Sequence, residues 1–336
     1  MKNYFVSLVI PCRNEKNYIG KFLDSLILQS WPKDQMEIVI ADGMSEDGTR
    51  EIIKEYQAKY PYIKLLDNPQ KYTPFALNIA IKASRGDVIV RLDSHAKYGV
   101  DYIAKCVKCL IQYKADNVGG NMKTIPAKNT LTAKSIALCM SRGLGVGNSY
   151  FRKGSDKPME VDTVFGGCYR REIFDKIGFF NENLKRSQDM EFNLRLKRAG
   201  GKIILVPEIV SYYYPKATLK EFLIHNFTDG QWAILPFKFT KRFFKLRHYI
   251  LLIFVSLILL LGIVSLFLPV VFIPLIIILG LYLVVVLASS IVIAFEEKKI
   301  GLLIFMPIAF LIRHFGYGAG SLLGLTKVAY SAIIKV

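Results

Sequence analysis

The sequence predicts an α/β fold with a mostly parallel sheet, followed by C-terminal transmembrane helices. Short apolar runs typical of buried strands alternate with helix-like segments through the first part of the 336-residue chain. From residue 249 onward the chain is almost continuously apolar, over stretches long enough to cross a bilayer. We therefore expect a folded domain at residues 1–236, a basic linker at 237–248 and a membrane region of two to three helices at 249–336.

The alternation in the first domain can be followed segment by segment. Apolar, β-branched runs predict strands at residues 5–10, 37–41, 63–66, 87–92 and 203–206. Apolar residues at helical spacing predict helices at residues 17–30, 50–60, 74–84 and 188–199. Repeated strand–helix units are typical of parallel sheets, because each helix returns the chain to the same end of the sheet.

Polar segments follow three of these strands, at residues 11–15, 42–47 and 93–95. Ligands of parallel α/β sheets bind beyond the carboxyl ends of the strands. The three segments are far apart in the sequence, and we expect them to converge at one edge of the sheet.

Asp93 and His95 directly follow a strand and are candidate ligands of a divalent metal. A carboxylate combined with phosphate oxygens suits Mg²⁺ or Mn²⁺, and an imidazole moves the preference towards Mn²⁺. Such a metal would neutralise the phosphates of a nucleotide. The alternative is a turn at the end of a strand, in which Asp93 only accepts local hydrogen bonds.

Two further acids have both a chemical and a structural interpretation. Asp42 could accept hydrogen bonds from a nucleobase or ribose, or could belong to a turn whose following helix is capped by Asp47 or Thr49. Asp189 could be a general base for an acceptor hydroxyl, or an acid that interacts with the N-terminal dipole of its helix.

The formal net charge of +18 favours an anionic membrane over nucleic acid as the partner. Basic residues gather just before the first long apolar run, and no nucleic-acid-binding motif accompanies them; they are Lys238, Lys241, Arg242, Lys245 and Arg247. The odd, scattered set of five cysteines indicates a reducing compartment. The N-terminus lacks the pattern of a signal peptide, so we expect the first domain to be cytoplasmic.

The apolar third predicts membrane helices at residues 249–268 and 270–295. A further apolar segment, residues 300–325, carries Arg313 and His314 near its middle. Ionisable side chains are costly in lipid, so this segment could face a cavity, re-enter the membrane or lie at the interface.

Several motifs together resemble the family 2 glycosyltransferases. Residues 6–15, with the sequence VSLVIPCRNE, look like the opening of that family, and the segments of Asp42, Asp93 and Asp189 follow in its order. The motifs RLDSHA, GVGNSYFR and VDTVFGG at residues 91–96, 145–152 and 161–167 are similar to the succinoglycan-biosynthesis glucosyltransferase branch. Residues 314–320, HFGYGAG, resemble its last motif. The resemblance covers about residues 5–236.

The resemblance implies a GT-A fold, with a Rossmann-like sheet, and inverting transfer by a single displacement. The residues implied to bind the nucleotide-sugar are Pro11, Arg13, Glu15, Asp42 and Asp93. Those implied to bind Mn²⁺ or Mg²⁺ are Asp93 and His95. Gly166, Gly167 and Gln188 would lie on the acceptor side, and Asp189 would be the catalytic base.

The chain departs from the family pattern at three places. His95 stands where the metal motif usually has a second acid, and Gln188 stands where a glutamate usually precedes the base. Residues 230–232 have only Gly-Gln-Trp where processive synthases carry Gln-x-x-Arg-Trp, which disfavours repeated addition of sugars.

The motifs therefore predict transfer of a single sugar from a nucleotide-sugar, most readily a UDP-sugar, to a lipid-linked saccharide in cell-surface polysaccharide biosynthesis. The expected location is the cell (inner) membrane, as a multi-pass protein whose catalytic domain is cytoplasmic and which binds no nucleic acid. One alternative is a polyprenyl-phosphate sugar synthase, whose acceptor is the lipid phosphate itself. Another is a non-catalytic membrane partner that has lost activity.

Overall fold

A computed structural model describes residues 4–240 and 245–333, which form two compact units. The first, here called the sheet unit, comprises Met1–Lys123 and Tyr150–Tyr213. The second, the helical unit, comprises Thr124–Ser149 and Tyr214–Val336. Lys241 and Arg242 of the predicted basic linker lie outside the described residues.

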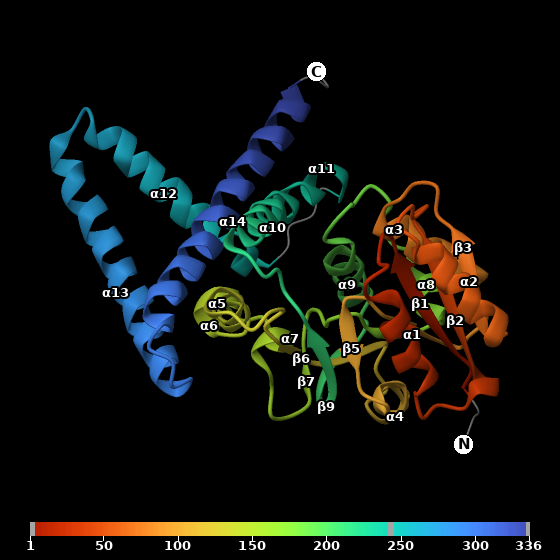
Figure 1. Ribbon diagram of the computed structural model, residues 1–336. Helices are drawn as coiled ribbons and strands as arrows, with labels where there is room; N and C mark the ends of the chain where they lie inside the picture. Colours follow the sequence, from red (N-terminus) through yellow and green to blue (C-terminus); the bar gives the residue numbers. More distant parts are fainter. Residues whose placement is uncertain (1–3, 241–244, 334–336) are drawn as a thin grey trace. The chain divides into compact units, whose positions relative to one another are not determined.

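Within the described residues, nine strands form one sheet with the order β3-β2-β1-β4-β8-β6-β9-β5, and β7 pairs with β9 (Figure 1). One half is parallel, in which β1 pairs with β2 and β4, and β2 pairs with β3. These strands are β1 Val6–Cys12, β2 Met36–Asp42, β3 Ile63–Asp67 and β4 Val88–Arg91. They are the predicted strands, with ends that differ by at most two residues.

The other half of the sheet is antiparallel, with β4 paired to β8, β8 to β6, and β9 to both β5 and β7. Its strands are β5 Ala96–Tyr98, β6 Asn117–Thr124, β7 Met159–Glu160, β8 Cys168–Arg170 and β9 Ile203–Tyr213. The sequence predicted only part of β9. β5, β7 and β8 have two or three residues each, too few to display the two-residue periodicity from which a strand is recognised.

Helices cover both faces of the sheet, so its strands are buried on both sides. Leu8 and Ile10 of β1 belong to one apolar core, whereas Val9, between them, belongs to the other. The first core contains α1 Ile19–Ile27, α2 Thr49–Lys59 and α4 Tyr102–Gln112. The second contains α3 Thr73–Ala83, α8 Glu172–Ile177 and α9 Gln188–Arg198.

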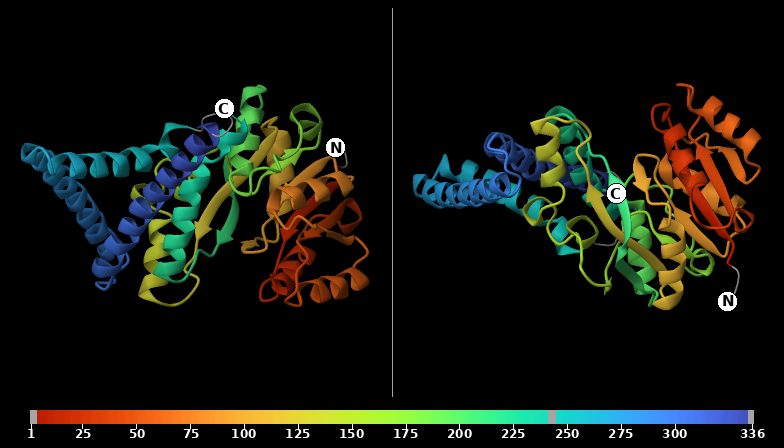
Figure 2. Two further views of the ribbon diagram at one scale, coloured as in Figure 1. Left: turned by 90° about the horizontal axis from the view of Figure 1, so that it is seen from above. Right: turned by 60° about the horizontal axis from the view of Figure 1, so that its bottom comes forward.

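The helical unit contains the apolar C-terminal helices and the segments packed on them (Figure 2). Its helices are α5 Leu131–Cys139, α6 Gly143–Val146, α10 Leu219–Ile234, α11 Pro236–Thr240, α12 Ile250–Ser265, α13 Phe272–Glu296 and α14 Leu302–Ile333. Residues 214–236 belong to the helical unit, whereas the sequence predicts that the first domain ends after residue 236. The difference arises because α10 packs along α14.

Glycines bring the backbones of α10 and α14 into direct contact. A Cβ atom built on Gly320 would lie 1.9 Å from the carbonyl oxygen of Phe227, and one on Gly230 would lie 2.0 Å from that of Tyr317. Gly316 and Gly324, each one turn away from Gly320, also face α10. Small residues at this four-residue spacing allow helices to approach closely in membranes.

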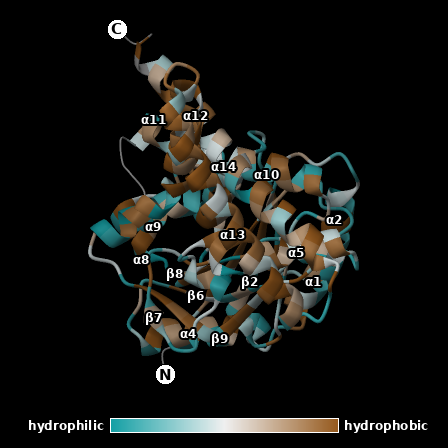
Figure 3. Cartoon of the chain, turned by 90° about the vertical axis from the view of Figure 1, so that its left-hand side faces the viewer, coloured by the Kyte–Doolittle hydropathy of each residue, from teal (hydrophilic) through white to brown (hydrophobic). Residues whose placement is uncertain are grey.

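Among the described residues, two helices are long and apolar enough to cross a membrane, Pro269–Glu296 and Leu302–Ser331. Figure 3 shows the hydrophobic colouring of these C-terminal helices. The prediction of a spanning helix at residues 249–268 was wrong in its length. Helix α12 has 16 residues, because the chain turns at residues 266–271 before α13 begins.

Most of the ambiguous segment at residues 300–325 belongs to one continuous helix, α14, which begins at Leu302. Its ionisable pair is bonded inside the helical unit. Arg313 donates to the carbonyl oxygen of Gly145 at 2.9 Å and to Asn226 Oδ1 at 2.5 Å. His314 contacts the carbonyl oxygen of Leu144 through Nε2 and the Tyr282 hydroxyl through Nδ1, each at 2.9 Å. The cost of burying these groups is offset by the hydrogen bonds.

Candidate active site

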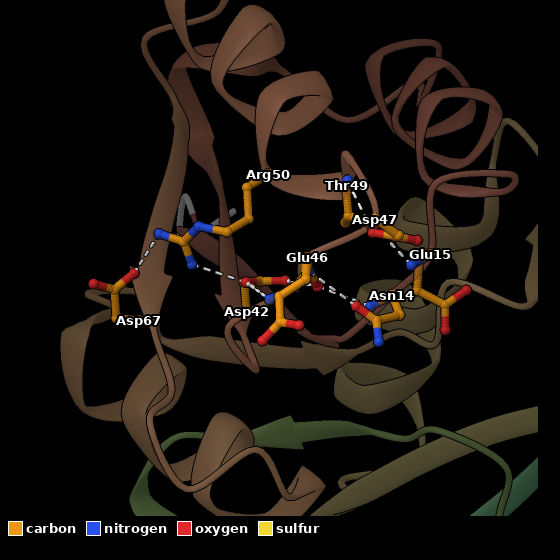
Figure 4. Close-up of polar contacts among 9 residues, drawn as sticks. Asn14, Glu15, Asp42, Glu46, Asp47, Thr49, Arg50 and Asp67 are labelled. Carbon is orange, nitrogen blue, oxygen red and sulfur yellow. Dashed lines mark hydrogen bonds and ion pairs between the residues drawn. The ribbon is translucent and has the colours of Figure 1, made fainter.

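The loops that follow β1 and β2 are joined by hydrogen bonds at the carboxyl edge of the parallel strands (Figure 4). The backbone N–H of Asn14 donates to Ser45 Oγ at 2.8 Å, and that of Glu15 donates to Thr49 Oγ1 at 2.7 Å. The backbone N–H of Glu46 donates back to Asn14 Oδ1 at 3.2 Å. The convergence of the segments around Asp42 and Glu15, expected from the sequence, is present in the structure.

Asp42 is fully buried at the end of β2 and organises the loop that follows it. Its Oδ2 accepts hydrogen bonds from the backbone N–H of Ser45 and from Arg50 Nη1, both at 2.8 Å. The other end of the Arg50 guanidinium contacts Asp67 at 2.6 Å, as Figure 4 shows. Asp42 therefore makes the turn contact that the structural interpretation predicts. A nucleotide would have to bind Asp42 in addition to these hydrogen bonds.

Gly48 takes the N-cap position of α2 without a side-chain cap, so neither Asp47 nor Thr49 caps the helix as the sequence suggested. Asp47 instead joins the two loops. Its Oδ1 accepts from the backbone N–H of Thr49 at 3.1 Å, and its Oδ2 accepts from that of Lys16 at 3.1 Å. Burial raises the pKa of Asp47, but the hydrogen bonds from Thr49 and Lys16 together outweigh it and lower the pKa. A carboxylate that stays ionised keeps the two loops joined.

Arg13 lies against Gly43, because the carbons of its side chain are 3.0–3.2 Å from where a Cβ atom of that glycine would be. Pro11 is half-buried near the end of β1. Both residues therefore lie at the same edge as Asp42.

Glu15 and His95 form a pair that the sequence did not predict. His95 Nε2 is 2.7 Å from Glu15 Oε1, and the edge of the Tyr18 ring packs against the imidazole. Glu15 is buried, and within the described residues its Oε2 has no hydrogen-bond partner. A buried carboxylate oxygen without a partner is costly, so this position favours a polar ligand.

Asp93 follows β4 and is held on two sides. Its backbone N–H donates to the Tyr98 hydroxyl oxygen at 3.0 Å, and its carboxylate oxygens lie 3.3 and 3.4 Å from Arg91 Nη2. Burial raises the pKa of Tyr98, and the negative charge of Asp93 raises it further. Tyr98 therefore remains a neutral hydroxyl at physiological pH.

Asp189 lies in the first turn of α9 and faces the other η nitrogen of the same arginine. Its Oδ2 is 3.6 Å from Arg91 Nη1, and its Oδ1 accepts from the backbone N–H of Met190 at 2.9 Å. Gln188 beside it is buried. The structure thus shows the helix-end contact that the structural interpretation predicts, and it also brings Asp189 to the site.

Gly166 and Gly167 lie beside the end of β4, with φ angles of +66° and +111°. The carbonyl oxygen of Gly167 accepts from the backbone N–H of Arg91 at 2.9 Å, and a Cβ on Gly166 would lie 2.8 Å from the carbonyl oxygen of Arg91. The pair therefore requires glycine in order to close the backbone around Arg91.

The residues present fit a divalent metal that binds together with a diphosphate. Across the described residues, no three His, Cys, Asp or Glu side chains form a complete metal cage. Mg²⁺-type sites at phosphates commonly use one or two carboxylates, with phosphate oxygens and water completing the coordination. The carboxylate of Asp93 is 26% exposed and makes only long contacts with Arg91. His95 can use Nδ1, because its Nε2 faces Glu15.

Arg50 and Arg91 are the site residues that sequence reasoning missed. Each is a cation beside a candidate acid, and Arg91 ends an otherwise apolar strand. A charged residue at the end of a buried strand, close to an aspartate, is the signal from which the importance of Arg91 could have been inferred.

The family profile described as Glycosyl transferase family 2 matches residues 7–178, about half of the chain and most of the sheet unit. The chain belongs to this family. The family resemblance, the fold class and the expectation of a glycosyltransferase are confirmed by this match and by named relatives.

Two relatives of this family member are each 30% identical to it. One is a dolichyl N-acetyl-α-D-glucosaminyl phosphate 3-β-D-2,3-diacetamido-2,3-dideoxy-β-D-glucuronosyltransferase of Methanococcus voltae, matched over 67% of this chain and 72% of the relative. The other is the succinoglycan biosynthesis protein ExoA of Rhizobium meliloti, matched over 68% and 73%. The latter agrees with the branch inferred from the motifs.

A solved mannosyltransferase from Pyrobaculum calidifontis, in complex with GDP-Man and Mn²⁺, has a similar fold. The TM-score is 0.62 at 18% identity, over 97% of this chain and 88% of that one. At this identity the similarity establishes the fold, and it extends over the C-terminal helices as well as the sheet.

Proposed function

We propose that this glycosyltransferase transfers a single sugar, with inversion, from a nucleotide-sugar to a lipid-linked glycan, with the help of a divalent metal. One observation carries the proposal: Asp93 and Asp189, 96 positions apart in the sequence, contact opposite nitrogens of one buried arginine, Arg91. The acid proposed to face the donor and the proposed base therefore belong to one site.

In this proposal the nucleotide lies along the carboxyl edge of β1, β2 and β4, bound by the residues Pro11, Arg13, Glu15, Asp42 and Asp93. Asp93 and His95 would hold Mn²⁺ or Mg²⁺, which neutralises charge on the leaving diphosphate. Arg50 and Asp47 keep the loop after β2 in place.

Asp189 would act as the general base on the acceptor. Its carboxylate takes the proton of the acceptor hydroxyl as the hydroxyl oxygen forms a bond to the anomeric carbon of the donor sugar. The bond from that carbon to the diphosphate oxygen breaks, and the nucleoside diphosphate leaves with the electron pair. Attack opposite the leaving group inverts the anomeric configuration. Gly166, Gly167 and Gln188 would line the acceptor side.

The donor we propose is a UDP-sugar, and separate features support a lipid-linked acceptor and a location at the cell membrane. The relative from Methanococcus voltae is named for a dolichyl-linked sugar phosphate acceptor, and ExoA is named for polysaccharide biosynthesis. The helical unit has two helices, among the residues described, that are able to cross a membrane. We propose that residues 1–236 act as the catalytic domain on the cytoplasmic side, with a multi-pass anchor formed by residues 249–336.

The test is a donor screen with the full chain in detergent, reading the released nucleotide and the glycolipid product. Asp93→Asn and Asp189→Asn should each lose at least about 100-fold in kcat. Asp101→Asn is a matched control, because the half-exposed side chain of Asp101 pairs with the half-exposed Lys105 of α4 at 2.7 Å. Full activity of Asp93→Asn or Asp189→Asn would refute the role of that residue. A product formed on polyprenyl phosphate, and not on a lipid-linked saccharide, would establish the alternative acceptor.

A further inference from the structure

Arg91 is a buried cation between two acids with different proposed roles. Its side chain is 8% exposed, and it projects from the end of β4, the strand that joins the parallel and antiparallel halves of the sheet. Burial alone would lower the pKa of Arg91, but the charges of Asp93 and Asp189 outweigh that effect and raise it. The guanidinium therefore stays charged in a place where a charge needs partners.

The hydrogen-bonding capacity of Arg91 is only partly used. Nη2 contacts both oxygens of Asp93 at 3.3 and 3.4 Å, and Nη1 lies 3.6 Å from Asp189. Nε and Nη1 are buried without a hydrogen-bond partner within the residues described. A purely structural arginine normally has its donors satisfied, as Arg195 does with the carbonyl oxygen of Phe179 at 2.7 Å and with Glu191 at 2.8 Å.

The backbone around Arg91 is fixed from both sides. Its N–H is bonded to the carbonyl oxygen of Gly167, and it pairs with Val9 in the β1–β4 ladder. A planar guanidinium on a rigid strand can set the separation of two carboxylates, whereas the point charge of a lysine cannot reach both in the same way.

We propose that Arg91 is a positioning residue, which holds the carboxylates of Asp93 and Asp189 at a fixed separation so that donor and acceptor are aligned. This inference rests on the proposed function, because it assumes that Asp189 acts as the base. Arg91 itself need not touch the substrate, and its effect on transfer is exerted through the two acids. Misplacement of a reacting group by about 1 Å can cost about 100-fold in rate.

The experiment is a double-mutant cycle with Arg91→Met, Asp189→Asn and the double variant, in the full chain. Arg91→Met should lower kcat about 100-fold and change the KM for the donor less than about 3-fold. In the Asp189→Asn background the same substitution should lower kcat by about 10-fold or less, because only the effect of Arg91 through Asp93 remains.

Controls separate positioning from folding and from the proposed function. Arg195→Met removes a partly buried arginine, 18% exposed, whose described hydrogen bonds lie within α8, α9 and the turn between them, so it should lower the unfolding temperature and leave kcat unchanged. If Arg91→Met does not fold, Arg91→Lys replaces it in the cycle. Equal losses of kcat in both backgrounds, or a loss no larger than that of Arg195→Met, would overturn the positioning role. Full activity of Asp189→Asn alone would instead refute the proposed base.

Discussion

We expect a glycine-to-alanine substitution to lower the stability of the protein at Gly320, where α14 contacts α10, and not to lower it at Gly280 on α13. In Gly320→Ala the new Cβ would lie 1.9 Å from the carbonyl oxygen of Phe227, where ordinary contacts begin at 3.4 Å. The two backbones would have to separate by about 1.5 Å, since neither side offers a flexible side chain that could move away. In Gly280→Ala on α13, no described atom lies within 4 Å of the new Cβ.

The magnitudes follow from these distances. Alanine favours a helix by up to about 1 kcal/mol relative to glycine, and both variants gain this term. Overpacking costs about 1–3 kcal/mol, and a clash between two backbones lies at the upper end of that range. We expect a net loss of about 2 kcal/mol for Gly320→Ala and a change between 0 and about +1 kcal/mol for Gly280→Ala. The unfolding temperatures should differ by roughly 4–12 °C.

Buried thiols provide the assay. Every cysteine lies in the described part of the chain and is a buried free thiol, so a thiol-reactive fluorophore reports unfolding. Cys139 belongs to the helical unit, and its Sγ lies 3.7 Å from the carbonyl oxygen of Ala309 on α14. Labelling of Cys139 should begin at a lower temperature in Gly320→Ala than in Gly280→Ala. Equal labelling temperatures would refute the close contact of α10 with α14.

Three further predictions concern the sheet unit and the metal. Burial alone raises the pKa of Glu37, but hydrogen bonds from Lys64 and its other donors lower it below the usual 4.5. Its stabilisation is therefore present above pH 4.5 and lost as pH falls through the lowered pKa. Glu37→Gln should cost about 1–3 kcal/mol at pH 7 and flatten the acid limb of an unfolding curve measured against pH. Arg50→Met should weaken nucleotide binding about 10-fold by calorimetry, because Asp42 loses the cation that holds it in the loop; unchanged affinity would contradict this. EDTA should abolish turnover, and Mn²⁺ or Mg²⁺ should restore it. Turnover that continues in EDTA would contradict the metal role of Asp93.

Much of the site could be predicted because local chemistry marks it. An acid directly after a buried strand, as at Asp42 and Asp93, points to the carboxyl edge of a sheet, and the strand–helix alternation predicts that such edges coincide. The pairing of Glu15 with His95 could not be predicted, because it depends on the register of β1 and β4 and on the path of the loops that follow them. The same applies to the arginine contacts of Asp42 and Asp93.

The sequence by itself determined the parallel half of the sheet, the family and the apolar character of residues 249–333. These follow from periodicity and local motifs, which are properties of neighbouring residues. Only the tertiary structure decided that the second half of the sheet is antiparallel, that α12 ends after 16 residues and that α10 packs along α14. It also placed Arg91 between Asp93 and Asp189. Each of these depends on contacts between distant segments, whose free energies are not written in any local pattern.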